Sequence, residues 1–112
     1  MTREVSVSSL FASRLADSEN PEDEIIEVVY PEEITSLLED IHDNYPGFER
    51  IDSLTIDSSD IDNEGNGSIE VGYDVVYFDF DSGDIDTDKR SMNIGVEYDQ
   101  RETITLTGEE DG

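Results

Sequence analysis

The chain has 112 residues and a formal net charge of −25, because 31 Asp and Glu residues stand against six Lys and Arg. A surface of this charge repels nucleic acids and anionic membranes, which argues against direct binding to either, and it attracts cations and basic proteins. With no cysteine, the chain has no disulfide, no thiolate nucleophile and no Cys-ligated zinc.

The apolar content is sufficient for a modest core. Leu, Ile, Val and Phe together make up about a quarter of the residues, above the level at which a highly charged chain stays disordered. We expect one small domain over residues 1–112 with a flexible tail over about 108–112. No apolar run approaches the roughly 18 residues of a membrane span, and the N-terminus lacks the continuous apolar segment of a secretory signal. These features predict a cytoplasmic protein.

The first thirty residues contain short elements. Residues 2–9 alternate valine with polar residues, which predicts a half-buried strand. Residues 10–17 favour a short helix with Ser9 as its cap. The polar segment 17–24 is typical of a loop, and the β-branched run at 24–30 predicts a strand that is well covered.

A single amphipathic helix is predicted over about 31–43. Pro31 suits the first helical position, and Glu32 and Glu33 complement the positive end of the helix dipole. The segment 44–48 ends the helix with a proline and a glycine. The apolar stripe follows the spacing i, i+3, i+4, i+7 and consists of Ile34, Leu37, Leu38 and Ile41.

After residue 50 the apolar period changes to two. Strands are predicted within 50–57, 68–81, 91–99 and 102–108. The second of these shifts phase by one residue at 75–76, which indicates either a bulge or a strand that is covered on both faces.

Two Asp-, Gly- and Ser-rich segments, 58–67 and 81–89, are predicted to connect these strands. The pattern as a whole predicts an α+β domain, with an antiparallel β-meander of about 4–6 strands and the helix at about 31–43 packed on its apolar face. A second, short N-terminal helix is an option within this fold.

Residues 60–70 are similar to a calcium-binding loop. The match includes Gly65 at the sixth position, but the twelfth position, where an EF-hand places its bidentate glutamate, is Val71. The flanking segments also predict strands rather than helices. We therefore expect no specific metal site and keep a calcium-binding domain as an alternative. Its ligands would be Asp60, Asp62, Glu64 and Glu70.

No arrangement of residues predicts catalysis. The single histidine, His42, falls in the last turn of the predicted helix, where a cation near the negative end of the dipole is favourable for structural reasons alone. The sequence offers no Ser-His or Cys-His pair and no Gly-rich phosphate loop. We expect a protein that is not an enzyme, with no catalytic residue and no cofactor.

The aromatic residues of the strands are expected to be mostly core. One face of the sheet is an alternative place for tyrosines among carboxylates, where they would suit an interface with a basic protein. The residues concerned are Tyr73, Tyr77, Phe78, Phe80 and Tyr98.

The carboxylates themselves predict a surface that binds a basic partner. Same-face residues of a strand repeat at about 6.6–6.8 Å, and every second phosphate level of B-DNA matches this spacing. The candidate partner-binding residues are Glu32, Glu33, Glu39, Asp40, Asp43, Asp60, Asp62, Glu64, Glu70, Asp74, Asp84, Asp86, Asp88, Glu97 and Asp99.

The favoured hypothesis is a DNA mimic that occupies the basic groove of a nucleic-acid-binding protein, as an inhibitor of a nuclease, restriction or CRISPR enzyme or of a repressor. In size and composition the chain resembles small DNA-mimic proteins of phages and mobile elements, although no motif matches such a family residue by residue. A monomer and a homodimer are both open.

Two other interpretations remain from different classes. An acidic, lysine-poor surface also keeps the proteins of halophiles soluble, and Arg outnumbers Lys five to one here. The acidity would then be an adaptation to salt. An antitoxin or immunity protein that neutralises a basic toxin is physically close to the mimic.

Overall fold

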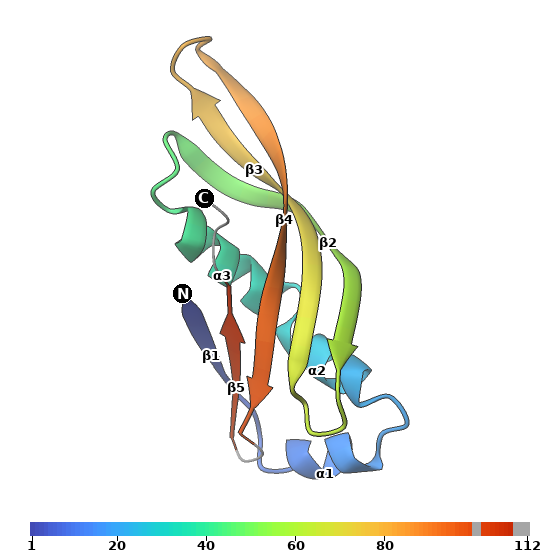
Figure 1. The fold of residues 1–112 in the computed structure, drawn as a ribbon. Coiled ribbons are helices and arrows are strands. Elements are labelled where there is room, and N and C mark those ends of the chain that lie inside the picture. The colour runs from blue at the N-terminus through green and yellow to red at the C-terminus, as the bar shows by residue number, and fades with distance from the viewer. Residues whose placement is uncertain (100–101, 109–112) are drawn as a thin grey trace.

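The computed structural model describes residues 1–99 and 102–108 and has an α+β fold, with a five-stranded antiparallel sheet and three helices (Figure 1). The strand order is β1-β5-β4-β3-β2, so that β2 to β5 form the predicted meander and the N-terminal strand lies beside β5. In chain order the elements are β1 (Thr2–Ser6), α1 (Phe11–Asp17), α2 (Pro21–Val29), α3 (Glu32–His42), β2 (Phe48–Ile61), β3 (Gly67–Asp79), β4 (Asp84–Tyr98) and β5 (Thr103–Thr107).

One core lies between the sheet and the helices. The alternation in β3 and β4 turns every second side chain toward α2 and α3, which lie across one face of the sheet, while α1 lies at one end (Figure 1). The opposite face of the sheet carries mainly polar side chains. The fully buried aliphatic residues are Ile25, Val29, Ile34, Leu37, Leu38, Ile69, Val71, Val75, Ile94, Ile104 and Leu106.

The helix predicted over about 31–43 is confirmed as α3. Its predicted stripe faces the sheet, with Ile34, Leu37 and Leu38 fully buried and Ile41 half-buried. Pro31 is the residue that caps the helix rather than its first residue. The period of the apolar residues was sufficient for this element because one face of the helix meets the sheet and the other meets solvent.

The strand predicted at 24–30 is wrong, because this segment is the second half of α2. Ile25 and Val29, four residues apart, are fully buried, which fits the period of a helix. Pro21 occupies the first turn together with three acidic residues, all of which favour a helix N-terminus. The loop predicted at 17–24 is correspondingly shorter.

The short N-terminal helix is present as α1, but its predicted cap is wrong. Leu10 occupies the cap position and no side chain caps the helix. The carbonyl oxygen of Ser8 accepts a hydrogen bond from the Phe11 amide at 3.0 Å, so that a backbone turn starts the helix in place of Ser9.

Two strands extend into the segments that were predicted as connections. β2 continues through residues 58–61 and β4 begins at Asp84, so the predictions of loop at 58–61 and 84–89 are wrong. In both places pairing with β3 provides the backbone hydrogen bonds. Asp60 of β2 lies opposite Ser68, and Asp84 of β4 lies opposite Asp79. Asp-rich sequence has low strand propensity, but pairing with a neighbouring strand overrides it.

The phase shift at 75–76 has its origin in β2. β3 pairs with β4 without interruption, whereas β2 has a register shift between Phe48 and Arg50, opposite Tyr77 and Val76. Val75 and Val76 point to opposite faces and both are buried. The strand is therefore covered on both faces here, and the bulge lies in its neighbour.

The molecule is elongated, with principal extents of 53 × 22 × 20 Å. β3 and β4 extend as a hairpin beyond the helices, and the N-terminus lies toward the middle of the molecule (Figure 1). Of the tail predicted over about 108–112, Gly108 exchanges backbone hydrogen bonds of 3.0 Å with Met1, and residues 109–112 lie outside the described part of the chain.

Candidate protein-binding surface

Five of the predicted carboxylates lie on the outer side of α3 or just after it. Glu33 is half-buried because its carboxylate pairs with the guanidinium of Arg3 from β1 at 2.6 Å. The others are exposed, since they alternate with the buried stripe of the helix. This group consists of Glu32, Glu33, Glu39, Asp40 and Asp43.

A second group lies on the sheet face that turns away from the helices. On β3 and β4 these residues lie between buried core residues of the same strand, and on β2 Asp60 lies next to the buried Ile61. Asp74 stands in register between Asp52 of β2 and Lys89 of β4, so one cation and two carboxylates share a row of the sheet. The predicted members of this group are Asp60, Glu70, Asp74 and Glu97.

A third group lies at the end of the molecule formed by residues 44–48 and 76–88, which we call the hairpin end. Asp84, Asp86 and Asp88 lie here on β4 rather than in a loop. They occupy the same face as the core residues further along the strand, because they continue the alternation of Met92 and Ile94.

The last group lies at the opposite end, in the turns near α1. Oδ1 of Asp62 accepts the amides of Glu64 and Asn66 at 2.9 and 3.0 Å. Oδ1 of Asp99 likewise accepts the amides of Glu102 and Thr103, both at 3.1 Å. Two of these predicted partner-binding carboxylates therefore hold turns in place.

The structure does not place the predicted calcium ligands of residues 60–70 together as a metal site. Asp60 is paired in β2, Asp62 caps the turn, and Glu70 lies well inside β3 on the open face. Across residues 1–99 and 102–108, no group of three or more His, Asp or Glu side chains is placed to hold a metal ion. Gly65 is explained by its backbone, which has φ +85° in the turn.

His42 faces the core rather than solvent. Its side chain is 1% exposed, and its Nε2 atom lies 2.7 Å from the hydroxyl of Tyr73 on β3. The last turn of α3 is therefore joined to the sheet by a buried polar contact between His42 and Tyr73. This role could not be predicted from the helix dipole, because it depends on a partner 31 residues later in the chain.

The aromatic residues of the strands divide into two groups. Tyr73 and Tyr98 are core residues, each 3% exposed, as predicted. The prediction of a core position is wrong for Phe80, which is 73% exposed, and Tyr77 and Phe78 are only half-buried. These three residues lie at the hairpin end, beyond the helices that cover the rest of the sheet.

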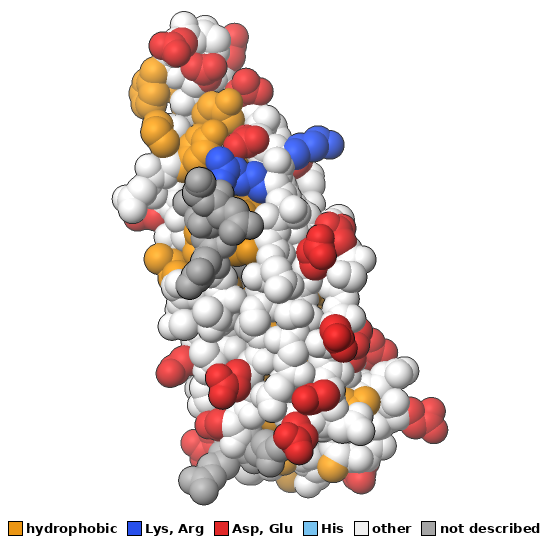
Figure 2. Space-filling view, in the orientation of Figure 1, with side chains coloured by type: hydrophobic (Ala, Val, Ile, Leu, Met, Phe, Trp, Pro, Cys, Tyr) orange, Lys and Arg blue, Asp and Glu red, His pale blue; other side chains and the backbone are white. Residues whose placement is uncertain are grey.

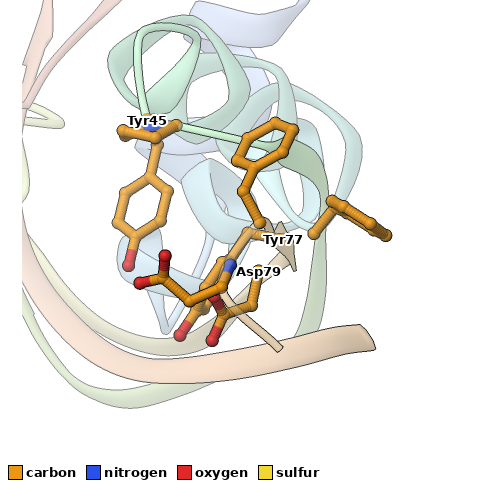
Figure 3. A pocket seen from close by; sticks show the side chains of 7 residues that line it. Tyr45, Tyr77 and Asp79 are labelled. Carbon is orange, nitrogen blue, oxygen red and sulfur yellow. The ribbon is translucent and has the colours of Figure 1, made fainter. Parts of the chain in front are cut away.

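The hairpin end contains an open hollow of about 380 Å³ lined by aromatic and acidic side chains. Tyr45, from the loop after α3, packs against Tyr77 with 5.1 Å between ring centroids. Figure 3 shows the side chains of Tyr45, Tyr77 and Asp79 around this hollow. Phe78 and Phe80 contact each other edge to face, with 5.2 Å between centroids.

Carboxylates border these rings. The hydroxyls of Tyr45 and Tyr77 are directed at Asp88 and Asp86, each at 3.5 Å. Desolvation, and then the negative charge of Asp86, raise the pKa of Tyr77 above its ordinary value. The hydroxyl therefore stays protonated and remains a donor across the physiological range.

The surface of the hairpin end differs from the rest. Ile85, on the same sheet face as Phe78, is 53% exposed, and with Phe80 it makes an apolar area bordered by carboxylates. Figure 2 shows hydrophobic side chains gathered toward this end, with acidic side chains and some Lys or Arg side chains beside them, and further acidic side chains scattered along the remainder of the visible face. Sequence reasoning missed Tyr45 and Ile85. The only signal in the sequence for Tyr45 was that an aromatic residue stands in the segment 44–48, which ends the predicted helix.

No protein-family model matches the chain, and neither the curated proteins nor the solved structures give a match. Within the part of the chain that the structure describes, no helix has the length and apolar character needed to cross a bilayer.

Proposed function

We propose that the protein is a non-enzymatic DNA mimic, which occupies the nucleic-acid-binding groove of a basic protein. The observation that carries this proposal is the amount of charge along an elongated body. A net charge of −25 over a longest dimension of 53 Å is one negative charge per about 2 Å. Duplex DNA carries one per about 1.7 Å of its axis.

The distribution of the charge supports the same proposal. The carboxylates lie on the helix layer, on the open sheet face and at both ends, so the negative charge is spread over the elongated body rather than gathered in one patch. Four arginines pair with nearby carboxylates, which offsets their positive charge locally. The pairs are Arg3–Glu33, Arg14–Glu24, Arg50–Asp52 and Arg90–Asp88.

A groove that binds duplex DNA by its phosphate backbone would accept such a body. Phosphate contacts supply the sequence-independent part of DNA binding, and a mimic has to reproduce only that part. Association should be fast at low salt and should weaken as salt screens the two surfaces. The partner is therefore a protein whose own affinity for DNA falls steeply with salt.

Competition with DNA tests the proposal. The immobilised protein is exposed at low salt to a nuclease-treated lysate of the source organism, and retained proteins are eluted with duplex DNA or with polyglutamate. We expect DNA to elute basic proteins at a lower charge concentration than polyglutamate does. Each eluted protein, once purified, should bind either DNA or this protein but not both together. Simultaneous binding of DNA and this protein would overturn the proposal. So would the finding that the folded, immobilised protein retains no basic protein from the lysate.

Salt adaptation is the competing explanation of the same charge, and it predicts the opposite dependence of folding on salt. Near-UV circular dichroism is recorded as potassium chloride is raised. A mimic should have its native spectrum at low salt, where it must meet its partner. A domain that folds only toward molar salt, where screening relieves repulsion among carboxylates, would support adaptation and contradict the mimic.

A further inference from the structure

We propose that the hollow at the hairpin end binds an arginine side chain of the basic partner, which stacks on its aromatic rings and pairs with its carboxylates. This inference deepens the proposed function and rests on it for the identity of the partner as a basic protein. The binding chemistry of the hollow can be tested separately, because it is a local property of this chain.

The hollow exists because the sheet changes width. β2 pairs with β3 only as far as Phe48 opposite Tyr77, while β3 continues to Asp79. The loop before β2 then lies beside the edge of β3, and the amide of Phe78 donates to the carbonyl oxygen of Gly47 at 2.8 Å. Side chains of the loop and of β3 consequently face each other across an edge that no further strand covers.

The rings of the hollow are held in place before any partner binds. Tyr45 and Tyr77 pack against each other at 5.1 Å, and Phe78 and Phe80 at 5.2 Å. Phe80 is nevertheless 73% exposed. A large apolar side chain with this exposure, inside a cluster and bordered by charge, is the pattern of an interaction site rather than of scattered surface residues.

A carboxylate in the hollow is also fixed in position. Oδ1 of Asp79 accepts the amides of Asp81 and Ser82 at 2.9 and 3.4 Å, which sets the orientation of the carboxylate group. Within the described residues, its Oδ2 atom accepts no hydrogen bond. A cation entering the hollow therefore meets an oriented negative charge beside aromatic rings.

The chain itself contains an example of this mode of binding. The guanidinium carbon of Arg90 lies 5.4 Å from the ring centroid of Tyr45, and its Nε atom lies 2.9 Å from Asp88. An arginine held between a tyrosine ring and a carboxylate therefore already occurs next to the hairpin end. The hollow offers a second guanidinium the same two kinds of contact.

Arginine fits these contacts better than lysine does. Its planar guanidinium is weakly hydrated, stacks on aromatic rings and pairs with carboxylates through several donors, whereas the ammonium of lysine is compact and strongly hydrated. A purely apolar ligand would leave the carboxylates of Asp79 and Asp81 without a partner charge. The volume, about 380 Å³, lies at the lower end of the roughly 300–1,000 Å³ of small-ligand sites, which suits a single long side chain.

The test uses a defined probe, the capped tripeptide N-acetyl-Gly-Arg-Gly-amide, titrated into ¹⁵N-labelled full-length protein. We expect saturable chemical-shift changes confined to the amides of Tyr45, Gly47 and residues 77–82. The lysine version of the peptide should bind about two- to five-fold more weakly, because its ammonium is strongly hydrated and lacks the planar, multi-donor fork of the guanidinium. The citrulline version, which is planar but uncharged, should produce no saturable change.

Three variants localise the binding. Phe80→Ala should weaken binding of the arginine peptide about two- to five-fold. Asp79→Asn should weaken it by a similar factor, since its side-chain oxygen can still cap the turn while the charge is lost. Leu10→Ala is the matched control, because Leu10 is 70% exposed but lies beside α1 at the other end, and it should leave binding unchanged.

Shifts spread evenly over all acidic loops without saturation would overturn the inference. So would equal binding of the arginine and lysine peptides, or binding that Phe80→Ala leaves intact. If the protein still competed with DNA for basic proteins in that case, the mimic would stand and only the arginine site would fail. If the peptide bound as expected and no DNA-binding protein competed, the arginine site would stand without the mimic.

Discussion

The same two strands, β3 and β4, serve two different purposes along their length. Where α2 and α3 cover them, every second residue is a buried hydrophobic residue such as Val71 or Ile94. At the hairpin end the alternation continues, but the corresponding positions hold residues such as Tyr77 and Asp86. The backbone pairing alone extends the strands, and the side chains there are left to contact solvent or a partner.

The difference shows how a small, highly charged domain can separate stability from binding. Burial of apolar area supplies the stability and is concentrated in the helix-covered region. Tyr45 and Phe48 pack against the edge of that core, whereas Tyr77, Phe78 and Phe80 lie beyond it and should contribute little to the stability of the fold. Substitutions in the two regions should consequently differ in their effects on the free energy of unfolding.

The largest effect is expected for Leu37→Ala in the helix-covered region. Leu37 is fully buried between α3 and the sheet, and its truncation leaves a cavity. We expect a loss of about 2–5 kcal/mol in the free energy of unfolding, measured by urea denaturation. A loss below about 1 kcal/mol would mean that this region is loosely packed and that stability is not concentrated in the helix-covered region.

A pair of glycines tests how firmly the hairpin end is attached to the loop after α3. Gly47 and Gly83 both have φ +75°, so alanine at either position costs about 1–2 kcal/mol of backbone strain. In Gly47→Ala the new Cβ would also clash with the carbonyl oxygen of Phe78, whereas among the described residues nothing lies within 4 Å of a Cβ at Gly83.

We therefore expect Gly47→Ala to destabilise the protein by about 1–3 kcal/mol more than Gly83→Ala does. Amide hydrogen exchange should show the additional loss at Phe78, whose amide bonds to Gly47. Equal effects of the two substitutions would indicate that the loop and the edge of β3 move independently, and the hollow between them would then lack a fixed shape.

Two tyrosines provide a smaller contrast between the regions. Tyr73→Phe removes the hydroxyl that lies 2.7 Å from the buried Nε2 atom of His42, and we expect a cost of about 1–3 kcal/mol. Tyr77→Phe removes only a 3.5 Å contact with the exposed Asp86 and should change stability by less than about 0.5 kcal/mol. Thermal unfolding of the two variants decides, and similar costs would remove the distinction between core and hairpin end.

The elements that the sequence predicted well are those in which one face is buried. In α3 and in the helix-covered parts of the strands, burial of one side imposes the period that the pattern reveals. The run at 24–30 has apolar residues at four positions, which fit a covered strand as well as a helix. Pro21 and the acidic residues after it, which favour a helix, were the evidence against the strand.

The candidate site could be predicted only in part, because it depends on pairings between distant segments. The carboxylates were predicted, and tyrosines among carboxylates on one sheet face were an alternative to core positions, but the loop prediction at 84–89 concealed that Asp86 faces Tyr77 across a strand pair. Tyr45 lies in the loop between α3 and β2, and it contacts Tyr77 because β2 begins to pair with β3 at Phe48, opposite Tyr77. No local pattern carries that information.

The smallest effect on stability is expected for Phe80→Ala, although it removes a large aromatic side chain. Phe80 is 73% exposed and lies beyond the core, so the free energy of unfolding should change by less than about 0.5 kcal/mol. Leu10→Ala, at a residue 70% exposed beside α1, should change it equally little. Urea denaturation would therefore not distinguish the two variants, while titration with the arginine peptide would. A loss above about 1 kcal/mol for Phe80→Ala alone would assign its ring to the folding of the hairpin and would leave its exposure without a functional explanation.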